Sequence, residues 1–444
     1  MTNVKGIKAE KQNGKLKEYF SSLFRDSMDN YVHRRSRRLD TRLLLLVSAL
    51  LVVGLFSLAS SSYVYAYYHT DNHNSSYYIV QQLIYAAIGA AGMLAASYVP
   101  VKYYKQGLKW LYIITIIMLA LCYVCKAKNG CHRWLWLGKG PSFQPSELAK
   151  FTVIALGAYW GSELYTKKKP YLKNIRKRPK PSRKLSAPDR FFFRIGSFLC
   201  NTWELLRNSI FFYLGLVMVI ALLIVFETHL SCTIIIMLIA LTITFLAGMP
   251  WVPLLATMVT AGGAAIALIT SGIAAYSSTR IRVWQNPTAD LQGEGWQTTQ
   301  SLYAISNGGI FGRGIFNSTQ KYLYVSEPQN DFIFAIVCEE VGMVGAILII
   351  MLFMAFVCRA YIVSVKSPDR FSKLLGLGIA SQIAWQTLLN IAVVTNSMPN
   401  TGISLPFFSS GGTSLVMLLL EVGVLLAISR PGQEKFNKEG DALR

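Results

Sequence analysis

Three carboxylates stand where a polar stretch of the chain gives way to an apolar one. Asp331 occupies the junction, and Glu339 and Glu340 follow about two helical turns later within an otherwise apolar segment. An ionisable side chain at bilayer depth is costly unless it is paired or faces a wet cavity, so it marks a candidate functional site. An acid at the membrane edge with further acids below it indicates chemistry on a lipid-linked substrate.

The three acids are expected to have different roles. We take Asp331 as the candidate catalytic residue, although an aspartate at this position is also a common helix N-cap. Glu339 and Glu340 lie deeper, where a structural role is favoured over a direct chemical one. They are expected to pair with Lys150 or to cap a polar seam between helices.

Several charged and polar residues could bind an anionic substrate near Asp331. Arg280 and Arg282 lie two residues apart at the outer end of an apolar segment, and guanidinium groups match diphosphate oxygens in bidentate fashion. The alternative is that both arginines snorkel to the membrane interface. Further candidate substrate contacts are Gln320, Lys321 and Glu327, and the pair Glu147 and Lys150, which share one helix face and also suit a structural role.

The elements that must position these residues are membrane-spanning helices. The chain of 444 residues is 53% hydrophobic and only 15% charged, too apolar for an ordinary soluble domain. Apolar runs of about 20 residues, the length that crosses a bilayer, recur along it. The sequence therefore predicts an all-α polytopic membrane protein with about ten transmembrane helices, near 43–67, 77–98, 108–125, 146–163, 208–226, 230–248, 252–275, 332–358, 374–395 and 408–429.

The net charge of +22 suggests nucleic-acid binding, but the placement of the charges argues against it. With ten spans and the N-terminus inside, most Lys and Arg residues fall on the inner side, above all in 1–42 and 163–208. This is the positive-inside bias, and such basic segments meet anionic lipid headgroups. The sequence therefore predicts a multi-pass protein of the cytoplasmic membrane with both termini cytoplasmic. No cleavable signal peptide is recognised, so the first span is interpreted as an uncleaved anchor.

The predicted organisation is a basic tail (1–42), a ten-helix membrane domain (43–430) and a short tail (431–444). The membrane domain contains a basic cytoplasmic loop at 163–208 and a long extracellular loop at 276–330, between helices 7 and 8. A connection as long as the second is usually functional or disordered, and its many aromatic and aliphatic residues argue against disorder. Within it, 293–305 is expected to form a short interfacial helix that Gly308 and Gly309 end.

Other chemistries find no support in the sequence. No His, Cys and Asp spacing indicates a dedicated metal site. No Walker A loop and no glycine fingerprint of a nucleotide fold is present, so a nucleotide-driven pump is not indicated.

Motifs spread over residues 43–430 together resemble the SEDS family (shape, elongation, division and sporulation). The motifs are Arg133-Trp134, Gln144-Pro145-Ser146-Glu147 with Lys150, Asn286-Pro287, Gln300-Ser301-Leu302, Gly308-Gly309 with Gly312 and Gly314, Ser318 with Gln320-Lys321, Glu327 with Asp331-Phe332-Ile333-Phe334, Glu339-Glu340 with Gly342, and Pro399 with Gly402, Leu405-Pro406, Ser409 and Gly411-Gly412.

The resemblance implies a ten-span peptidoglycan glycosyltransferase that polymerises lipid II into glycan strands outside the membrane, in cell division, elongation or sporulation. The family's essential aspartate falls on Asp331, which the resemblance implies is the general base of an inverting transfer. On this hypothesis Arg280, Arg282 and Lys321 stabilise the diphosphate, alone or with a divalent cation (Mg²⁺ or Mn²⁺). No organic cofactor is expected. The implied partners are lipid II and the nascent strand, a class B penicillin-binding protein as transpeptidase, and other division or elongation membrane proteins.

Three positions depart from the family's usual pattern. Ser326 replaces a Pro, Ser410 replaces a Tyr, and Thr228-His229 replaces a Pro-Asp. Asn400-Thr401 favours the division or sporulation branch. Two other functions stay open: a lipid II flippase that uses Glu339, Glu340 and Lys150 as a polar track, and a non-catalytic scaffold for a transpeptidase.

Overall fold

The computed structural model describes residues 39–70, 72–125, 133–136, 142–166, 210–227, 229–248, 275–289, 293 and 295–430. Most of the described chain is helical, with long irregular stretches at 309–332 and 395–411. The helices are α2 (Thr41–His69), α3 (Tyr77–Tyr98), α4 (Val101–Cys122), α5 (Pro145–Thr166), α7 (Ile210–Phe226), α8 (Leu230–Leu246), α10 (Ala275–Gln285), α11 (Trp296–Gly308), α12 (Ile333–Val365), α13 (Arg370–Val394) and α14 (Gly412–Ser429). The remaining regular elements are a short antiparallel strand pair, β1 (Leu135–Trp136) and β2 (Ser142–Phe143), and the short helix η1 (Pro287–Ala289).

Nine of the ten predicted spans coincide with helices of the described part: α2, α3, α4, α5, α7, α8, α12, α13 and α14. Six of these are long and apolar enough to cross a membrane by themselves, namely α2, α3, α4, α12, α13 and α14. The predicted span at 252–275, the loop at 163–208 and most of both predicted tails lie outside the described residues. The prediction of a polytopic all-α membrane protein is confirmed.

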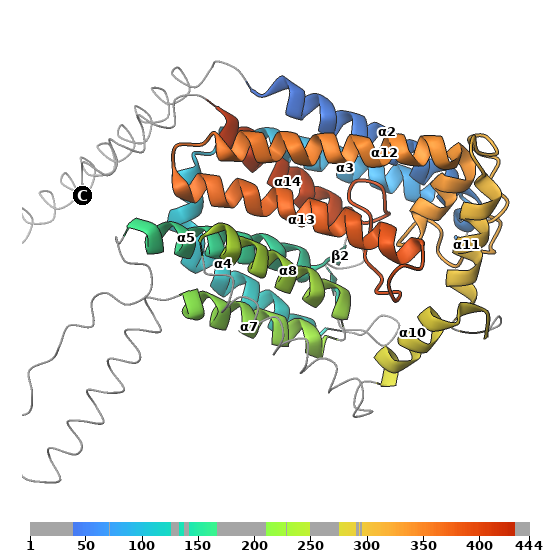
Figure 1. The fold of residues 1–444 in the computed structure, drawn as a ribbon, viewed down its shortest axis with the longest axis horizontal. Coiled ribbons are helices and arrows are strands. Elements are labelled where there is room, and N and C mark those ends of the chain that lie inside the picture. Colours follow the sequence, from blue (N-terminus) through green and yellow to red (C-terminus); the bar gives the residue numbers. More distant parts are fainter. Residues whose placement is uncertain are drawn as a thin grey trace, which may run out of the picture.

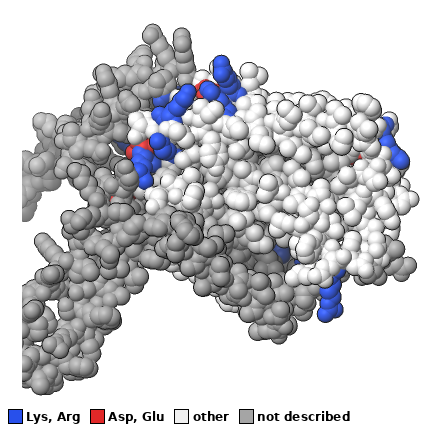
Figure 2. All heavy atoms as spheres, in the orientation of Figure 1, with Lys and Arg blue, Asp and Glu red and all other residues white. Residues whose placement is uncertain are grey.

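The long helices form one bundle with their axes roughly aligned, whereas α10 and α11 lie at one end of it (Figure 1). The predicted interfacial helix in the long loop is α11, which ends at Gly308 as expected. Lys and Arg gather at the opposite end, where α2 begins and α12 ends (Figure 2). There Asp40 caps α2 through Leu43 N (2.9 Å) and pairs with Arg359. We call the end with α11 the outer end.

Helix α12 contains a break that the apolar pattern did not predict. Gly342 adopts a left-handed conformation with φ of 68°, and an added Cβ would lie 2.2 Å from Gly312 N. The break frees backbone groups of α12, and these bond to residues 309–330, which we call the outer segment. Met343 N donates to Gly309 O (2.9 Å), and Gly314 N donates to Glu340 O (3.0 Å). The break therefore attaches the segment before Asp331 to the helix that follows it.

Candidate active site

Asp331 lies at the outer end of the bundle, two residues before α12, and its side chain is half-buried. The N-cap residue of α12 is Phe332 and no side chain caps this helix, so Asp331 does not serve as the helix cap. The carboxylate faces the irregular segment that leads into α14. An added Cβ at Gly402 would stand 3.1 Å from Asp331 Oδ2, so a larger residue there would press on the carboxylate.

Three consecutive backbone carbonyls hold Asp331 in place. Ser410 N donates to Gln329 O (2.8 Å), Ser409 Oγ donates to Asn330 O (2.9 Å), and Asn390 Nδ2 donates to Asp331 O (2.8 Å). Partly buried hydrogen bonds of this kind fix the backbone because a carbonyl shielded from water is costly to leave unpaired. Since Ser410 contributes its backbone N–H, the departure from Tyr at this position does not change the bond.

The surroundings of Asp331 suit a general base. Burial, together with the nearby charge of Glu327, raises the pKa of Asp331 to about 6, while Arg280 and Arg133 act to lower it. A base whose pKa lies near the working pH combines a useful ionised fraction with proton affinity. The carboxylate is therefore poised to accept a proton near neutral pH.

Arginines approach Asp331 from two other parts of the chain. Arg280, on α10, is half-buried, and its guanidinium donates to Asn400 O (2.5 Å). Arg282 is exposed on the same helix. Arg133, next to β1, was not among the predicted substrate contacts, yet its charge also acts on Asp331. The site thus combines one carboxylate with guanidinium groups that could meet phosphate oxygens.

Glu327 is a second carboxylate at the site. It is exposed, its Oε2 accepts a hydrogen bond from Asn330 Nδ2 (2.8 Å), and its φ of 50° is uncommon for a residue with a side chain. Strained backbone of this kind clusters at functional sites. Its charge acts on Asp331, so the two acids are coupled.

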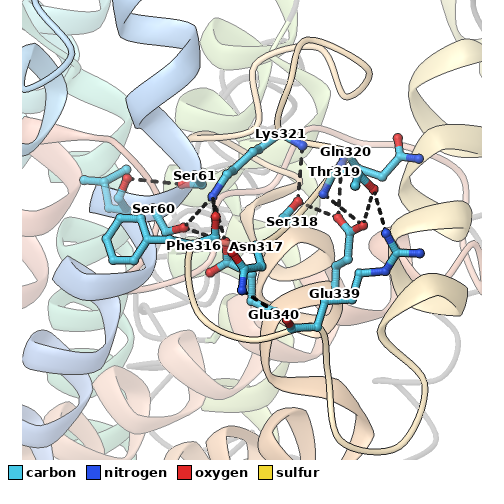
Figure 3. A network of polar contacts seen from close by, with 12 residues as sticks. Ser60, Ser61, Phe316, Asn317, Ser318, Thr319, Gln320, Lys321, Glu339 and Glu340 are labelled. Atoms are coloured by element: carbon cyan, nitrogen blue, oxygen red, sulfur yellow. Dashed lines mark hydrogen bonds and ion pairs between the residues drawn. The ribbon is translucent and has the colours of Figure 1, made fainter.

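Lys321 lies in a buried network of polar contacts (Figure 3). Its side chain is only 3% exposed, and its ammonium group contacts Phe316 O (2.5 Å), Ser60 Oγ (3.2 Å) and Glu340 Oε1 (3.2 Å). An ammonium group has three donor hydrogens, and these contacts use them all. In this structure Lys321 ties the outer segment to α2 and α12, whereas a substrate contact remains a prediction from sequence.

Glu339 fixes the same segment from the other side (Figure 3). Its carboxylate accepts bonds from Ser318 Oγ, from Thr319 N (3.2 Å) and Oγ1 (2.7 Å), and from Gln320 N (3.1 Å). The expected pairing of Glu339 and Glu340 with Lys150 is therefore wrong, because closer partners in the outer segment occupy both acids. Both acids instead lie in a polar seam between α12 and the segment that precedes it.

Lys150 belongs to a separate buried cluster between α5, α13 and α14. It pairs with Glu147 (2.8 Å), and both side chains are nearly fully buried. Glu421 of α14 adds a second acid, held by Gln382 Nε2 at 2.9 Å and close enough for its charge to act on Lys150. Glu421 was not among the predicted site residues, although a lone acid in an apolar span was the available signal.

Another missed acid, Glu227, follows the end of α7. It is buried, and burial raises its pKa to about 8, against the lowering effect of Arg133. Burial, Arg133 and Lys150 lower the pKa of His229 to about 3. Thr228 lies outside the described residues. The departure from the usual Pro-Asp thus places a neutral imidazole beside Arg133.

Among the described residues, no group of three or more His, Cys, Asp or Glu side chains is arranged to hold a metal ion. Asp331 and Glu327 are two carboxylates at the same site. Mg²⁺ is commonly held by one or two carboxylates together with substrate phosphates, so these residues fit a cation that arrives with a diphosphate.

Comparisons with known proteins agree over most of the chain. The sequence model of the family described as "Cell cycle protein" (FtsW, RodA, SpoVE) matches residues 41–434. Stage V sporulation protein E of Bacillus subtilis is 33% identical over 394 residues, covering 88% of this chain and 97% of that protein. A protein named probable peptidoglycan glycosyltransferase FtsW, from Trichlorobacter lovleyi, is 32% identical over 394 residues, covering 88% and 93%.

Solved structures show the same fold. One chain, from a study of how a peptidoglycan synthase complex coordinates polymerization and crosslinking, superposes with a TM-score of 0.65 at 20% identity and covers 88% of this chain and 98% of that one. The rod shape determining protein RodA of Thermus thermophilus gives 0.56 at 21% identity, covering 88% and 97%. The chain therefore belongs to the FtsW, RodA and SpoVE family, the SEDS family.

Proposed function

We propose that this protein is a peptidoglycan glycosyltransferase that polymerises lipid II at the outer face of the cytoplasmic membrane. The observation that carries the proposal is Asp331, held rigidly at the outer end of the bundle with a raised pKa and with arginines nearby. Family membership and the names of the relatives support the same activity.

The proposed step is an inverting displacement. Asp331 accepts the proton of the C4 hydroxyl of the incoming lipid II sugar. The hydroxyl oxygen forms a bond to C1 of the terminal sugar of the growing chain. The bond from C1 to the diphosphate oxygen breaks, and undecaprenyl diphosphate leaves with the electron pair. The proton then passes from Asp331 to water, which restores the base.

The leaving diphosphate carries charge that cations can stabilise. Arg280, Arg282 and Arg133 are guanidinium groups at this end of the bundle, and fixed positive charges stabilise developing negative charge. Lys321 has a lesser part in this proposal because its ammonium group is buried. A divalent cation held by Glu327 and the substrate diphosphate would supply further Lewis-acid stabilisation and leave Asp331 free to act as the base.

The proposed orientation places the gathered Lys and Arg side chains, and both termini, in the cytoplasm (Figure 2). The proposed partner is a class B penicillin-binding protein that crosslinks the strands. Its support is the likeness to a chain from a peptidoglycan synthase complex.

A second candidate function has one observation in its favour. The buried Glu147, Lys150 and Glu421 cluster places charge inside the bundle, as a transport path for lipid II would. A flippase would move labelled lipid II across liposomes, and Lys150→Met would stop that movement. A polymerase without transport activity would leave the labelled lipid II in the leaflet to which it was added.

The test of the proposed function compares wild type with Asp331→Asn, each with and without its transpeptidase, on lipid II with Mg²⁺ or Mn²⁺. Asparagine has the size of aspartate but cannot accept the proton. We expect glycan ladders from the wild type and none from the variant. Ladders of equal yield from both proteins would refute the role of Asp331, and no ladders from wild type would refute the activity.

A further inference from the structure

Aromatic side chains crowd the outer ends of α2 and α3. The Tyr–His cluster, as we call it, has stacked, tilted and edge-on ring pairs at centroid distances of 3.9 Å (Tyr65 and His69) to 6.0 Å (Tyr65 and Tyr78). Its members are Tyr65, Tyr67, Tyr68, His69, His73, Tyr77 and Tyr78. Tyr68 and Tyr77 are 62% and 46% exposed, so they present ring surface outward.

The length of α2 places this cluster beyond the hydrocarbon of the bilayer. The helix has 29 residues and is about 43 Å long, whereas the hydrocarbon core is about 30 Å thick. Ser60 of α2 contacts Glu340 of α12. Toward the outer end, His69 lies nine residues after Ser60, and Asp331 lies nine residues before Glu340. The Tyr–His cluster therefore stands at about the height of Asp331.

The Tyr–His cluster also borders the site. The charge of Glu327 acts on Asp331 and on the phenols of Tyr65 and Tyr78, so Glu327 lies near all three. The Gln329 side chain lies near the Tyr65 hydroxyl. A surface with aromatic faces thus begins where the carboxylate site ends.

We propose that the Tyr–His cluster is a binding surface for the sugars of the growing glycan strand, an inference that rests on the proposed function. In the transfer described above, the growing chain supplies the electrophilic C1, and its remaining sugars must lie along the protein next to the site. Pyranose rings present a face of C–H bonds that packs on an aromatic ring, while their rim hydroxyls seek polar partners. Amphipathic aromatic side chains suit such ligands because they combine ring area with a polar group.

The polar groups of the Tyr–His cluster are arranged for hydroxyl recognition. His69 Nδ1 and His73 Nδ1 each contact a backbone carbonyl, at 3.1 and 3.0 Å, so each Nδ1 must carry the hydrogen. In the neutral ring this leaves Nε2 as an acceptor for a sugar hydroxyl. Two hydrogen bonds hold the connection between α2 and α3: Asn74 N donates to Thr70 Oγ1 (2.8 Å), and Ser76 N donates to Asn74 Oδ1 (3.0 Å). A preorganised surface loses less entropy on binding.

The test uses the full-length protein in nanodiscs and a soluble probe, the β-1,4-linked hexamer of N-acetylglucosamine. Saturation-transfer NMR and titration would report binding without requiring polymerisation. We expect the wild type to bind this hexamer and not an α-1,4-linked glucose hexamer. Tyr68→Ala/Tyr77→Ala should weaken binding about tenfold, and Tyr68→Phe/Tyr77→Phe should retain most of it. Tyr103→Ala, at an exposed tyrosine on α4, is the matched control and should bind as wild type does.

Lipid II polymerisation provides the second readout. The alanine variant should make shorter strands than wild type at equal lipid II consumption. Equal probe binding and equal strand length in wild type and the alanine variant would overturn the inference and leave the tyrosines as an interfacial belt. Tyrosine-dependent binding by a wild type that makes no strands would instead refute the proposed function and keep the glycan surface.

Discussion

The clearest quantitative prediction concerns Lys321, which the sequence presents as a diphosphate ligand and the structure presents as an anchor. Its side chain is 3% exposed and that of Glu340 is 5% exposed, and the two charges lie 3.2 Å apart. Lys321→Met keeps the length and much of the volume of the side chain but removes the charge. The buried carboxylate of Glu340 would then lose its ion pair and keep the hydrogen bond from Ser60 Oγ.

Removing one partner of a buried ion pair costs about 3–5 kcal/mol, because the other charge is left unpaired. Here the lost free energy weakens the attachment of the outer segment to the helix bundle, because Lys321 belongs to that segment and Glu340 to α12. At about 1.4 kcal/mol per factor of ten, the detached form of the segment should become at least about 100 times more populated. Chymotrypsin cleavage at the exposed Tyr322 and Tyr324 measures this population, and glycan ladders measure the effect on activity.

A second substitution separates anchoring from substrate binding. Lys321→Met/Glu340→Gln removes both charges and should regain most of the protease protection and ladder yield. Arg282→Ala, at an exposed position, is the control for cleavage and should behave as wild type does in that assay. Wild-type cleavage of the single variant, or a double variant as inactive as the single one, would refute the anchoring role and favour direct contact with the diphosphate.

The initial polymerisation rate should fall about tenfold per pH unit below pH 6 and level off above it, because the base must be ionised and the pKa of Asp331 is about 6; a flat profile from pH 5 to 7 would contradict this. Gly342→Ala should lower the free energy of unfolding by more than about 1 kcal/mol through its positive φ and close contact, whereas Gly107→Ala, with open space around it, should be neutral or stabilising in the same thermal assay. Asn390→Leu leaves two buried carbonyls unpaired, which should cost about 2–6 kcal/mol of stability and most of the ladder yield; wild-type ladders would show that Asp331 needs no such support. Glu421→Gln preserves the contact with Gln382, so ladder yield should stay near wild type, and its loss would bring the buried cluster into the mechanism.

Much of the architecture was predictable because the bilayer imposes simple rules. Apolar runs of spanning length predicted nine helices that the structure describes, and the junction of polar and apolar sequence indicated Asp331. Glycines 308 and 309 predicted the end of α11. These predictions depend on local composition and length, and such properties can be read one segment at a time.

The partners of the charged residues could not be predicted in this way. Lys321 meets Ser60 across 261 residues of sequence, and Asn390 meets Asp331 across 59. The expectation that Glu339 and Glu340 pair with Lys150 failed because the break at Gly342 attaches the outer segment to α12 and supplies nearer donors.

The sequence alone therefore determined the membrane class and the approximate spans and indicated Asp331 as the candidate base, since hydrophobic length and the cost of buried charge are local properties. Only the tertiary structure decided which of the candidate groups reach that acid. Arg280 and Arg133 do so, whereas Lys321, Glu339 and Glu340 are bound within the polar seam. A buried polar group must find a partner wherever the packed helices provide one, and that choice depends on contacts between segments far apart in the chain.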